Sequence, residues 1–114
     1  MGSVSRGDVV LAAAAGDDGK PRPWLVVQAD PYNNADRPDS ILVCPFTSHE
    51  EAVSYRVPVN LPYGGTERAS WVMVDKLMAV KRERIRAVIA RVSPRELIRV
   101  ERAMIDLLGL PQMQ

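Results

Sequence analysis

The chain has 114 residues, of which 46% are hydrophobic and 25% are charged, as in an ordinary globular protein. This length allows one domain over residues 1–114 and excludes a second core of useful size. The net charge of +1 by itself indicates no nucleic-acid partner, and the apolar runs are too short for a membrane-spanning helix.

The start of the chain and its single cysteine predict the cellular compartment. No basic segment followed by an apolar segment opens the sequence, so we expect no secretory signal and a cytoplasmic location. Cys44 cannot form an internal disulfide and lies inside an apolar run. We therefore expect a buried, inert thiol in a reducing compartment.

The first half of the chain predicts short strands separated by turns. Strands are expected over residues 9–12 and 24–28, with a turn rich in glycine and aspartate between them. A polar loop is expected over residues 30–40. The continuous apolar run over residues 41–46 predicts a strand buried on both faces.

The second half predicts three more strands. Residues 54–59 alternate apolar with polar side chains, which indicates a half-exposed strand, and a proline places it near a sheet edge. Residues 61–65 are expected to form a loop, followed by a strand over residues 70–74. A connecting segment over residues 77–80 and a charged turn over 81–84 lead to a last strand over residues 85–92.

A helix is expected to close the chain. Ser93 as N-cap, Pro94 at the first position and Glu96 form the pattern of a capping box, and Gly109 ends the helix. Its apolar stripe consists of Leu97, Val100, Met104, Leu107 and Leu108. Many short strands and one helix indicate a mainly β fold, a small and strongly bent antiparallel barrel with the helix packed on it.

Charge is distributed unevenly along the chain. Residues 76–102 hold nine Lys or Arg and three Glu, whereas residues 1–75 hold six basic and ten acidic residues. This polarity can supply the electrostatic footprint of an RNA-binding face. Alternatively, Arg95, Arg99 and Arg102 only solvate the outer face of the helix.

Three segments at the mouths of predicted strands carry a family resemblance. They are Arg6-Gly7-Asp8-Val9-Val10, Arg22-Pro23-Trp24-Leu25-Val26-Val27 and Pro45-Phe46-Thr47-Ser48-His49, followed by Val72-Met73-Val74-Asp75-Lys76 and the Ser93-Pro94 helix. In this order they resemble the MazF/PemK family of toxin ribonucleases. The resemblance implies an SH3-like barrel of the CcdB/MazF type with a C-terminal helix.

The same resemblance implies a function. It predicts a homodimeric mRNA interferase that cuts single-stranded RNA in a sequence-selective way, without a metal or other cofactor. The expected products carry a 2′,3′-cyclic phosphate and a 5′-hydroxyl. The expected protein partner is an antitoxin whose disordered tail covers the RNA groove, and no membrane partner is expected.

Arg22 and Thr47 are the candidate catalytic residues. Metal-free cleavage needs proton transfer and a fixed cation near the phosphate, and a guanidinium offers donors matched to phosphate oxygens. The resemblance assigns Arg22 to proton transfer and transition-state stabilisation, and Thr47 to the catalytic site. Because His49 is the only histidine, a mechanism with two histidines is excluded.

Further residues are candidates for RNA binding or catalytic support. Ser48 and His49 follow Thr47 directly, and Tyr63 in a glycine-rich segment is the best candidate for base stacking. Asp75 and Lys76 either contact RNA or form a local ion pair at a strand end; the family often has glutamine where this chain has Lys76. Trp24 and Trp71 are also aromatic candidates for stacking, but their positions in strands favour the core or a dimer interface. Gly7 is expected to serve the backbone, and Asp8 to be structural or to border the site.

Two other functions remain open at this point. One is a non-enzymatic poison of DNA gyrase like CcdB, which shares the fold but relies on a tryptophan at the end of its last helix, absent here. The other is a catalytically degenerate binding module, which the departure at Lys76 leaves open.

Overall fold

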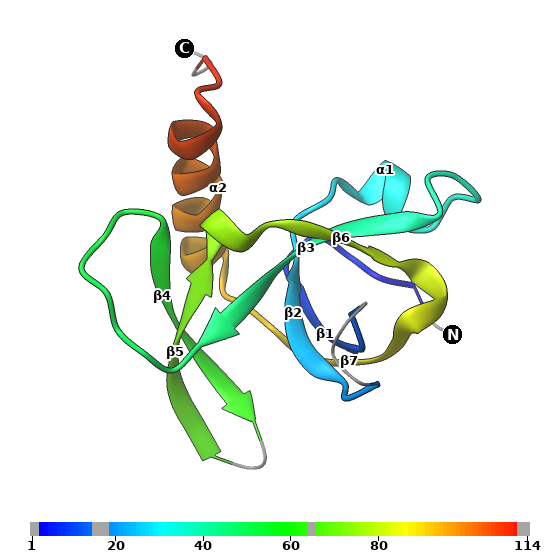
Figure 1. Ribbon diagram of the computed structural model, residues 1–114, viewed down its shortest axis with the longest axis horizontal. Helices are drawn as coiled ribbons and strands as arrows, with labels where there is room; N and C mark the ends of the chain where they lie inside the picture. The colour runs from blue at the N-terminus through cyan, green and yellow to red at the C-terminus, as the bar shows by residue number, and fades with distance from the viewer. Residues whose placement is uncertain (1–2, 15–18, 64–65, 112–114) are drawn as a thin grey trace.

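The computed structural model describes residues 3–14, 19–63 and 66–111, without the side chains of residues 62–68. In that part of the chain seven strands form one strongly bent sheet, and a long helix packs against it (Figure 1). The elements are β1 (Asp8–Ala12), β2 (Arg22–Val26), α1 (Asp30–Asn33), β3 (Ser40–Thr47), β4 (Arg56–Tyr63), β5 (Thr66–Met73), the 3₁₀ turn η1 (Val74–Lys76), β6 (Met78–Lys81), the 3₁₀ turn η2 (Arg82–Arg84), β7 (Ile85–Arg91) and α2 (Pro94–Leu108).

Strand β3 joins the two parts of the sheet. The strand order is β4-β5-β3-β2-β1-β7, with β6 paired to β3 off this path. The first half of β3 pairs with β6, its middle pairs with β2, and its last two residues pair with β5. Figure 1 shows β3 leaving the barrel of β1, β2, β6 and β7 to meet the β4–β5 hairpin. The predicted fold, a bent antiparallel barrel with a C-terminal helix, is confirmed.

Alternating side chains along the strands divide the apolar residues between two cores. On β2, Trp24 and Val26 face the interior of the barrel, and Leu25 faces the space beneath α2. On β1, Val10 and Val9 separate in the same way, because successive strand residues point to opposite faces. The barrel walls are therefore buried on both sides where α2 covers them.

The helix α2 begins as its capping pattern predicts. The Ser93 side chain accepts from the Glu96 backbone N–H at 3.1 Å, and the Glu96 carboxylate accepts from the Ser93 N–H at 2.8 Å. Gly109 ends the helix in the left-handed conformation with φ 68°. The predicted apolar stripe is covered only in part: Val100 is buried, but Leu107 and Leu108 are 44% and 51% exposed. The C-terminal end of the stripe extends beyond the sheet (Figure 1), so its last two residues have no strand beneath them.

The segment predicted as a loop over residues 61–65 is largely strand. β4 continues to Tyr63 and β5 begins at Thr66, so the two form a long hairpin. Pro62 does not stop β4 because β4 lies at the sheet edge, as predicted, where no neighbour needs its missing N–H. Gly64 and Gly65 lie outside the described residues.

The outward edge of β4 offers few backbone donors. Pro58 and Pro62 have none, and the N–H of Asn60 donates to the Glu96 carboxylate at 2.8 Å. The N–H of Arg56 donates to the Val53 carbonyl at 3.3 Å. This edge is thus protected against full pairing with a further strand.

Three further expectations need correction. Residues 77–80 were expected only to connect two strands, but Met78–Lys81 pairs with Ser40–Val43 as β6. The expected loop after β2 contains the short helix α1. Strand β3 is not buried on both faces throughout, because Leu42 is 41% exposed. All three depend on which neighbour a segment meets, which local composition does not encode.

Candidate active site

Strand pairing brings the two predicted catalytic residues to the same end of the sheet. β2 and β3 pair antiparallel with Trp24 opposite Pro45 and Val26 opposite Val43. The ladder ends at the pair of Trp24 and Pro45; Arg22 precedes Trp24 by two residues and Thr47 follows Pro45 by two, so both lie just beyond the same end of the ladder. Because residues two apart on a strand point to the same side, Arg22 and Thr47 are on the sides of their strands that carry Trp24 and Pro45.

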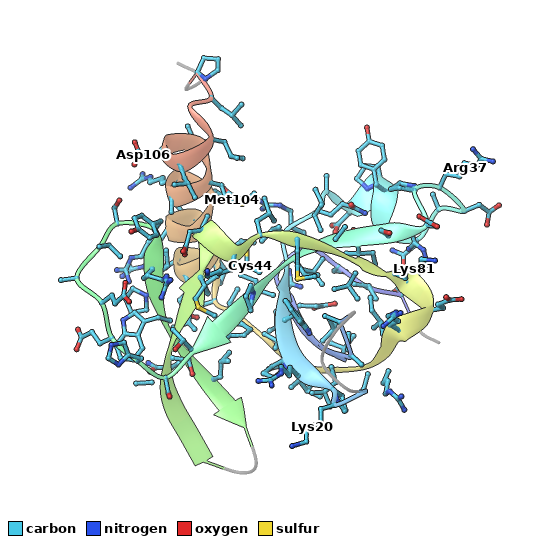
Figure 2. The ribbon with its side chains drawn as sticks, viewed as in Figure 1. Lys20, Arg37, Cys44, Lys81, Met104 and Asp106 are labelled. Atoms are coloured by element: carbon cyan, nitrogen blue, oxygen red, sulfur yellow. The ribbon has the colours of Figure 1, made fainter. Side chains whose placement is uncertain are left out.

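Both residues are accessible to a ligand at that position. Arg22 is exposed and Thr47 is half-buried. Figure 2 labels Lys20, two residues before Arg22, at the lower end of the barrel, away from Arg37 and Lys81. A guanidinium and a hydroxyl on one exposed face can hold a phosphate between them.

The hydroxyl of Thr47 has a defined role in the loop that follows. Its Oγ1 accepts from the His49 backbone N–H at 3.1 Å. A hydroxyl has one O–H donor besides its acceptor lone pairs, so this contact leaves the proton available for a phosphate oxygen. Ser48 and His49 are exposed just beyond Thr47, and this places them next to the candidate site.

Asp75 is engaged in an ion pair with a residue that sequence analysis did not select. Arg56 of β4 donates from Nε and Nη2 to the two carboxylate oxygens of Asp75, at 2.7 and 3.0 Å. The hydrogen bond from Arg56 holds the pKa of Asp75 below its ordinary value and raises that of Arg56. A carboxylate in this state is a weak proton acceptor.

This pairing corrects the expected environment of Asp75 and Lys76. An ion pair at a strand end was one of two interpretations, but the partner of Asp75 comes from β4, 19 residues earlier in the chain. Lys76 itself is exposed and can meet a phosphate. No sequence spacing identifies Arg56, because only the β4–β5 hairpin brings it to η1.

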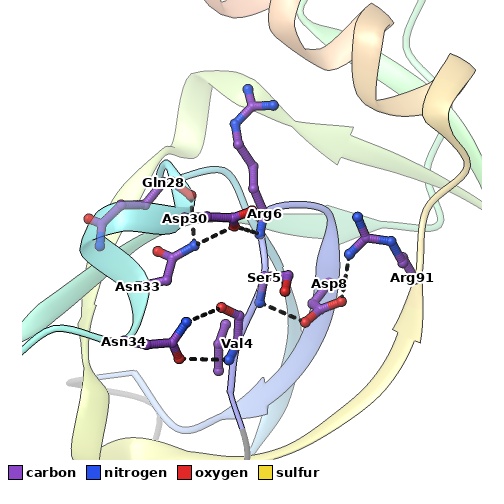
Figure 3. A network of polar contacts seen from close by, with 9 residues as sticks. All are labelled: Val4, Ser5, Arg6, Asp8, Gln28, Asp30, Asn33, Asn34 and Arg91. Carbon is purple, nitrogen blue, oxygen red and sulfur yellow. Dashed lines mark hydrogen bonds and ion pairs between the residues drawn. The ribbon is translucent and has the colours of Figure 1, made fainter.

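The Arg6–Asp8 segment serves the fold rather than the candidate site. Gly7 has φ 97°, as its backbone role predicts, and Asp8 is 8% exposed. The Asp8 carboxylate accepts from Ser5 N–H at 2.8 Å and from Arg91 Nη1 at 2.9 Å (Figure 3). Asp8 lies at the far end of β1 from Ala12, which pairs with Arg22. Of its two expected roles, the structural one applies.

Arg6 ties the N-terminal segment to two other elements. Its backbone N–H donates to Asp30 Oδ1 at 2.6 Å (Figure 3). Its Nε donates to the Val27 carbonyl at 3.0 Å. Its Nη1 donates to the carboxylate of Glu101 on α2. These contacts fix α2 against the barrel.

The helix arginines have a position beyond simple solvation. Arg99 and Arg102 are exposed, and together with Val57 and Pro58 of β4 they line a hollow of about 450 Å³. Two of the nine basic residues in the 76–102 segment thus lie at the seam between α2 and the edge strand, where Arg56 and Asp106 also line the hollow.

The aromatic candidates separate clearly. Trp24 is in the barrel core, 4% exposed, as expected. Trp71 is half-buried on β5, and the side chain of Tyr63 lies outside the described part of the chain. Cys44 is fully buried, as predicted, and burial raises its pKa to about 12.

The described residues contain no group of three or more His, Cys, Asp or Glu that could hold a metal ion. They also contain no helix long and apolar enough to cross a membrane.

Comparison with known proteins decides the family. The family of PemK-like, MazF-like toxins of type II toxin–antitoxin systems matches residues 5–108 of the chain. The chain belongs to this family. A curated relative, the "Probable endoribonuclease MazF" of Mycolicibacterium smegmatis, is 34% identical over 110 residues, which cover 94% of this chain and 98% of the relative.

Solved MazF structures share the fold. An endoribonuclease from a mycobacterial species superposes with a TM-score of 0.78 at 18% identity, covering 99% of this chain and 98% of the other. The MazE–MazF complex of Deinococcus radiodurans gives a TM-score of 0.73 at 24% identity, covering 97% and 100% of the two chains. The MazF/PemK architecture thus extends over nearly the whole chain.

Proposed function

We propose that this MazF/PemK family member is the endoribonuclease toxin of a type II toxin–antitoxin pair. Family membership and the curated relative support RNA cleavage as the activity. The observation that supports the proposal is that the exposed Arg22 and the half-buried Thr47 lie just beyond the same end of the β2–β3 ladder. The family comparisons favour this function over a gyrase poison.

The arrangement supports a metal-free reaction on single-stranded RNA. The 2′-oxygen attacks the adjacent phosphorus, the bond to the 5′-oxygen breaks, and a 2′,3′-cyclic phosphate and a 5′-hydroxyl form. Arg22 would stabilise the charge that builds on the phosphate and assist proton transfer, and the Thr47 hydroxyl would donate to a phosphate oxygen. Ser48 and His49 directly follow Thr47 and would support RNA binding, and the exposed Lys76 would meet a phosphate.

We further propose a homodimer that meets its RNA and its antitoxin in the cytoplasm. Leu107 and Leu108 at the end of α2 and the following Leu110 are between 44% and 52% exposed, apolar surface that a second copy could cover. The titles of related structures describe toxin bound to cognate antitoxin, which supports such a partner here. Sedimentation at micromolar concentration should show a dimer; a 12.6 kDa monomer would contradict this.

The activity is tested with purified protein and a pool of labelled single-stranded RNAs in excess EDTA. Cleavage should persist, and the 5′ ends should be accepted by a polynucleotide kinase without prior phosphatase treatment. Loss of all cleavage on chelation, with recovery on adding a divalent ion, would show that the mechanism needs a metal. A wild-type protein that cuts no RNA in the pool would reject the function itself.

A further inference from the structure

We propose that Trp71 is a stacking platform for a base of the RNA immediately beside the phosphate that is cut. The inference rests on the proposed ribonuclease function and deepens it by adding a binding subsite. It revises the expectation that Trp71 belongs to the core or to a dimer interface.

The strand register places Trp71 next to the candidate catalytic threonine. Thr47 of β3 lies directly opposite Trp71 of β5, and Trp71 lies directly opposite Pro58 of β4. Directly opposite residues share a sheet face, with Cβ atoms about 5 Å apart. A row of Thr47, Trp71 and Pro58 thus crosses three strands on one face, and Arg22 begins β2 just beyond the end of the β2–β3 ladder, where Thr47 ends β3.

The two tryptophans of the chain differ in the way that this role requires. Trp24 is buried in the barrel, and its indole N–H donates to the Ala12 carbonyl at 2.9 Å. Trp71 is only half-buried, and neither core cluster of described residues includes it. Its N–H has no acceptor among the described residues. An indole that keeps an accessible face and an unused donor is suited to a planar polar ligand.

A hollow continues the row past Trp71 to the edge of the sheet. It has a volume of about 180 Å³, and its lining includes Trp71, Pro58, Asn60, Arg99 and Glu96, whose carboxylate already accepts from the N–H groups of Asn60 and Ser93. The exposed amide of Asn60 can bond a base edge, and the Arg99 guanidinium can meet a phosphate. Stacking on an aromatic ring with a cation alongside is the usual way to hold single-stranded nucleic acid.

The geometry orders the subsites along the RNA. The phosphate would lie between Arg22 and Thr47, and the neighbouring base would lie on Trp71. The chain would then continue over the edge of β4, whose backbone donors are absent or already used. Full pairing with a further strand is therefore disfavoured at this edge, which leaves it open to a ligand such as a nucleotide that contacts side chains.

The test is a binding cycle between protein and RNA. The RNA is an oligonucleotide spanning a mapped cleavage site, with a 2′-O-methyl group at the attacking position so that it is not cut. Affinity is measured for wild type, Trp71→Phe and Trp71→Ala, with intact RNA and with a single abasic nucleotide at each position in turn. Tyr32→Ala is the matched control, because Tyr32 is an exposed aromatic residue, 56% accessible, on α1 of the barrel.

We expect Trp71→Ala to weaken binding by roughly 10-fold or more, and Trp71→Phe to retain most of the affinity. One abasic position beside the cleaved phosphate should weaken binding to wild type but cause no further loss with Trp71→Ala. In cleavage assays Trp71→Ala should raise KM and leave kcat near wild type. Tyr32→Ala should behave like wild type.

Several outcomes would overturn the inference. If Trp71→Ala binds the RNA as tightly as wild type, Trp71 makes no stacking contact. The same conclusion follows if the loss of affinity from Trp71→Ala and the loss from an abasic nucleotide multiply independently at every position. Dissociation of a dimer by Trp71→Ala, with RNA affinity per dimer unchanged, would assign the residue to an interface. If wild type neither cuts nor binds RNA, the proposed function fails together with the subsite; if it does both and only the Trp71 results disagree, the subsite alone fails.

Discussion

The two ends of strand β1 are both surrounded by charged residues, but they use the charge differently. At one end Asp8 is buried and pairs with Ser5 and Arg91, while Arg6 contacts Asp30, Val27 and Glu101. At the other end, about 14 Å along the strand by its rise per residue, Ala12 pairs with the exposed Arg22.

The difference shows that a charged motif at a strand mouth does not by itself identify a reactive group. At the Asp8 end, polar contacts satisfy the carboxylate and join separate elements, so its loss should reduce stability. At the Arg22 end, the side chains lie on an open face, so their loss should reduce activity. The following predictions test that division.

The largest effect is expected for Arg22→Ala. Removing the guanidinium should reduce kcat for RNA cleavage by about 10²-fold or more, because the charge developing on the phosphate loses its main stabilising donor. Arg22→Lys should restore little, since an ammonium keeps the charge and loses the paired donors. Cleavage of a fluorogenic RNA and thermal unfolding should be measured on the same preparations.

Arg37→Ala is the control for this prediction, because Arg37 is an exposed arginine on another side of the barrel (Figure 2). It should change neither rate nor melting temperature. Wild-type activity in Arg22→Ala, or a large drop in its melting temperature, would show that the Arg22 end is structural too.

Asp8→Ala should show the opposite pattern. The free energy of unfolding should fall by about 1–3 kcal/mol, because the Ser5 N–H loses its acceptor in a largely buried position. Loss of the ion pair with Arg91 should contribute little to this decrease in the free energy of unfolding, because the Arg91 side chain is 57% exposed. Urea unfolding measures the loss, and kcat per folded molecule should remain near wild type. A stable but inactive Asp8→Ala would place Asp8 in the active site.

A smaller effect is expected from the Arg56–Asp75 ion pair. The carboxylate pKa is depressed in the folded state, so the pair stabilises the protein above the unfolded pKa of about 4. That contribution is lost as the pH falls through the lower folded pKa. Asp75→Asn should therefore cost under about 1 kcal/mol at neutral pH and little in acid.

Urea unfolding across this pH range tests the sign for Asp75. Asp36→Asn is the control, since Asp36 is exposed and makes no hydrogen bond or ion pair within the described residues. A destabilisation by Asp75→Asn that grows in acid would contradict the pairing.

The smallest effect is expected for thiol modification. Cys44 is fully buried and its pKa is raised to about 12, so an aromatic disulfide reagent at pH 8 should not react with the native protein. One thiol should react after unfolding in denaturant. Rapid reaction without denaturant would mean that β3 opens locally in the native state.

Local signals in the sequence were sufficient for several elements and for the choice of candidate residues. The helix α2 begins at Ser93 and ends at Gly109 because capping and left-handed glycine act within one turn. The apolar run before Thr47 and the prolines around Arg22 placed both residues at strand ends for similarly local reasons. The family resemblance then gave these residues their expected roles.

Only the tertiary structure decided which of these residues meet. Arg56 reaches Asp75 and Trp71 lies beside Thr47 because of strand register, which is set by pairing between segments far apart in the chain. The exposure of Leu107 and Leu108 likewise depends on where the sheet beneath α2 ends. Composition and periodicity predict the face on which a residue lies, but long-range packing determines its neighbour on that face. In this protein the packing buries Trp24 in the core and leaves Trp71 available to a ligand.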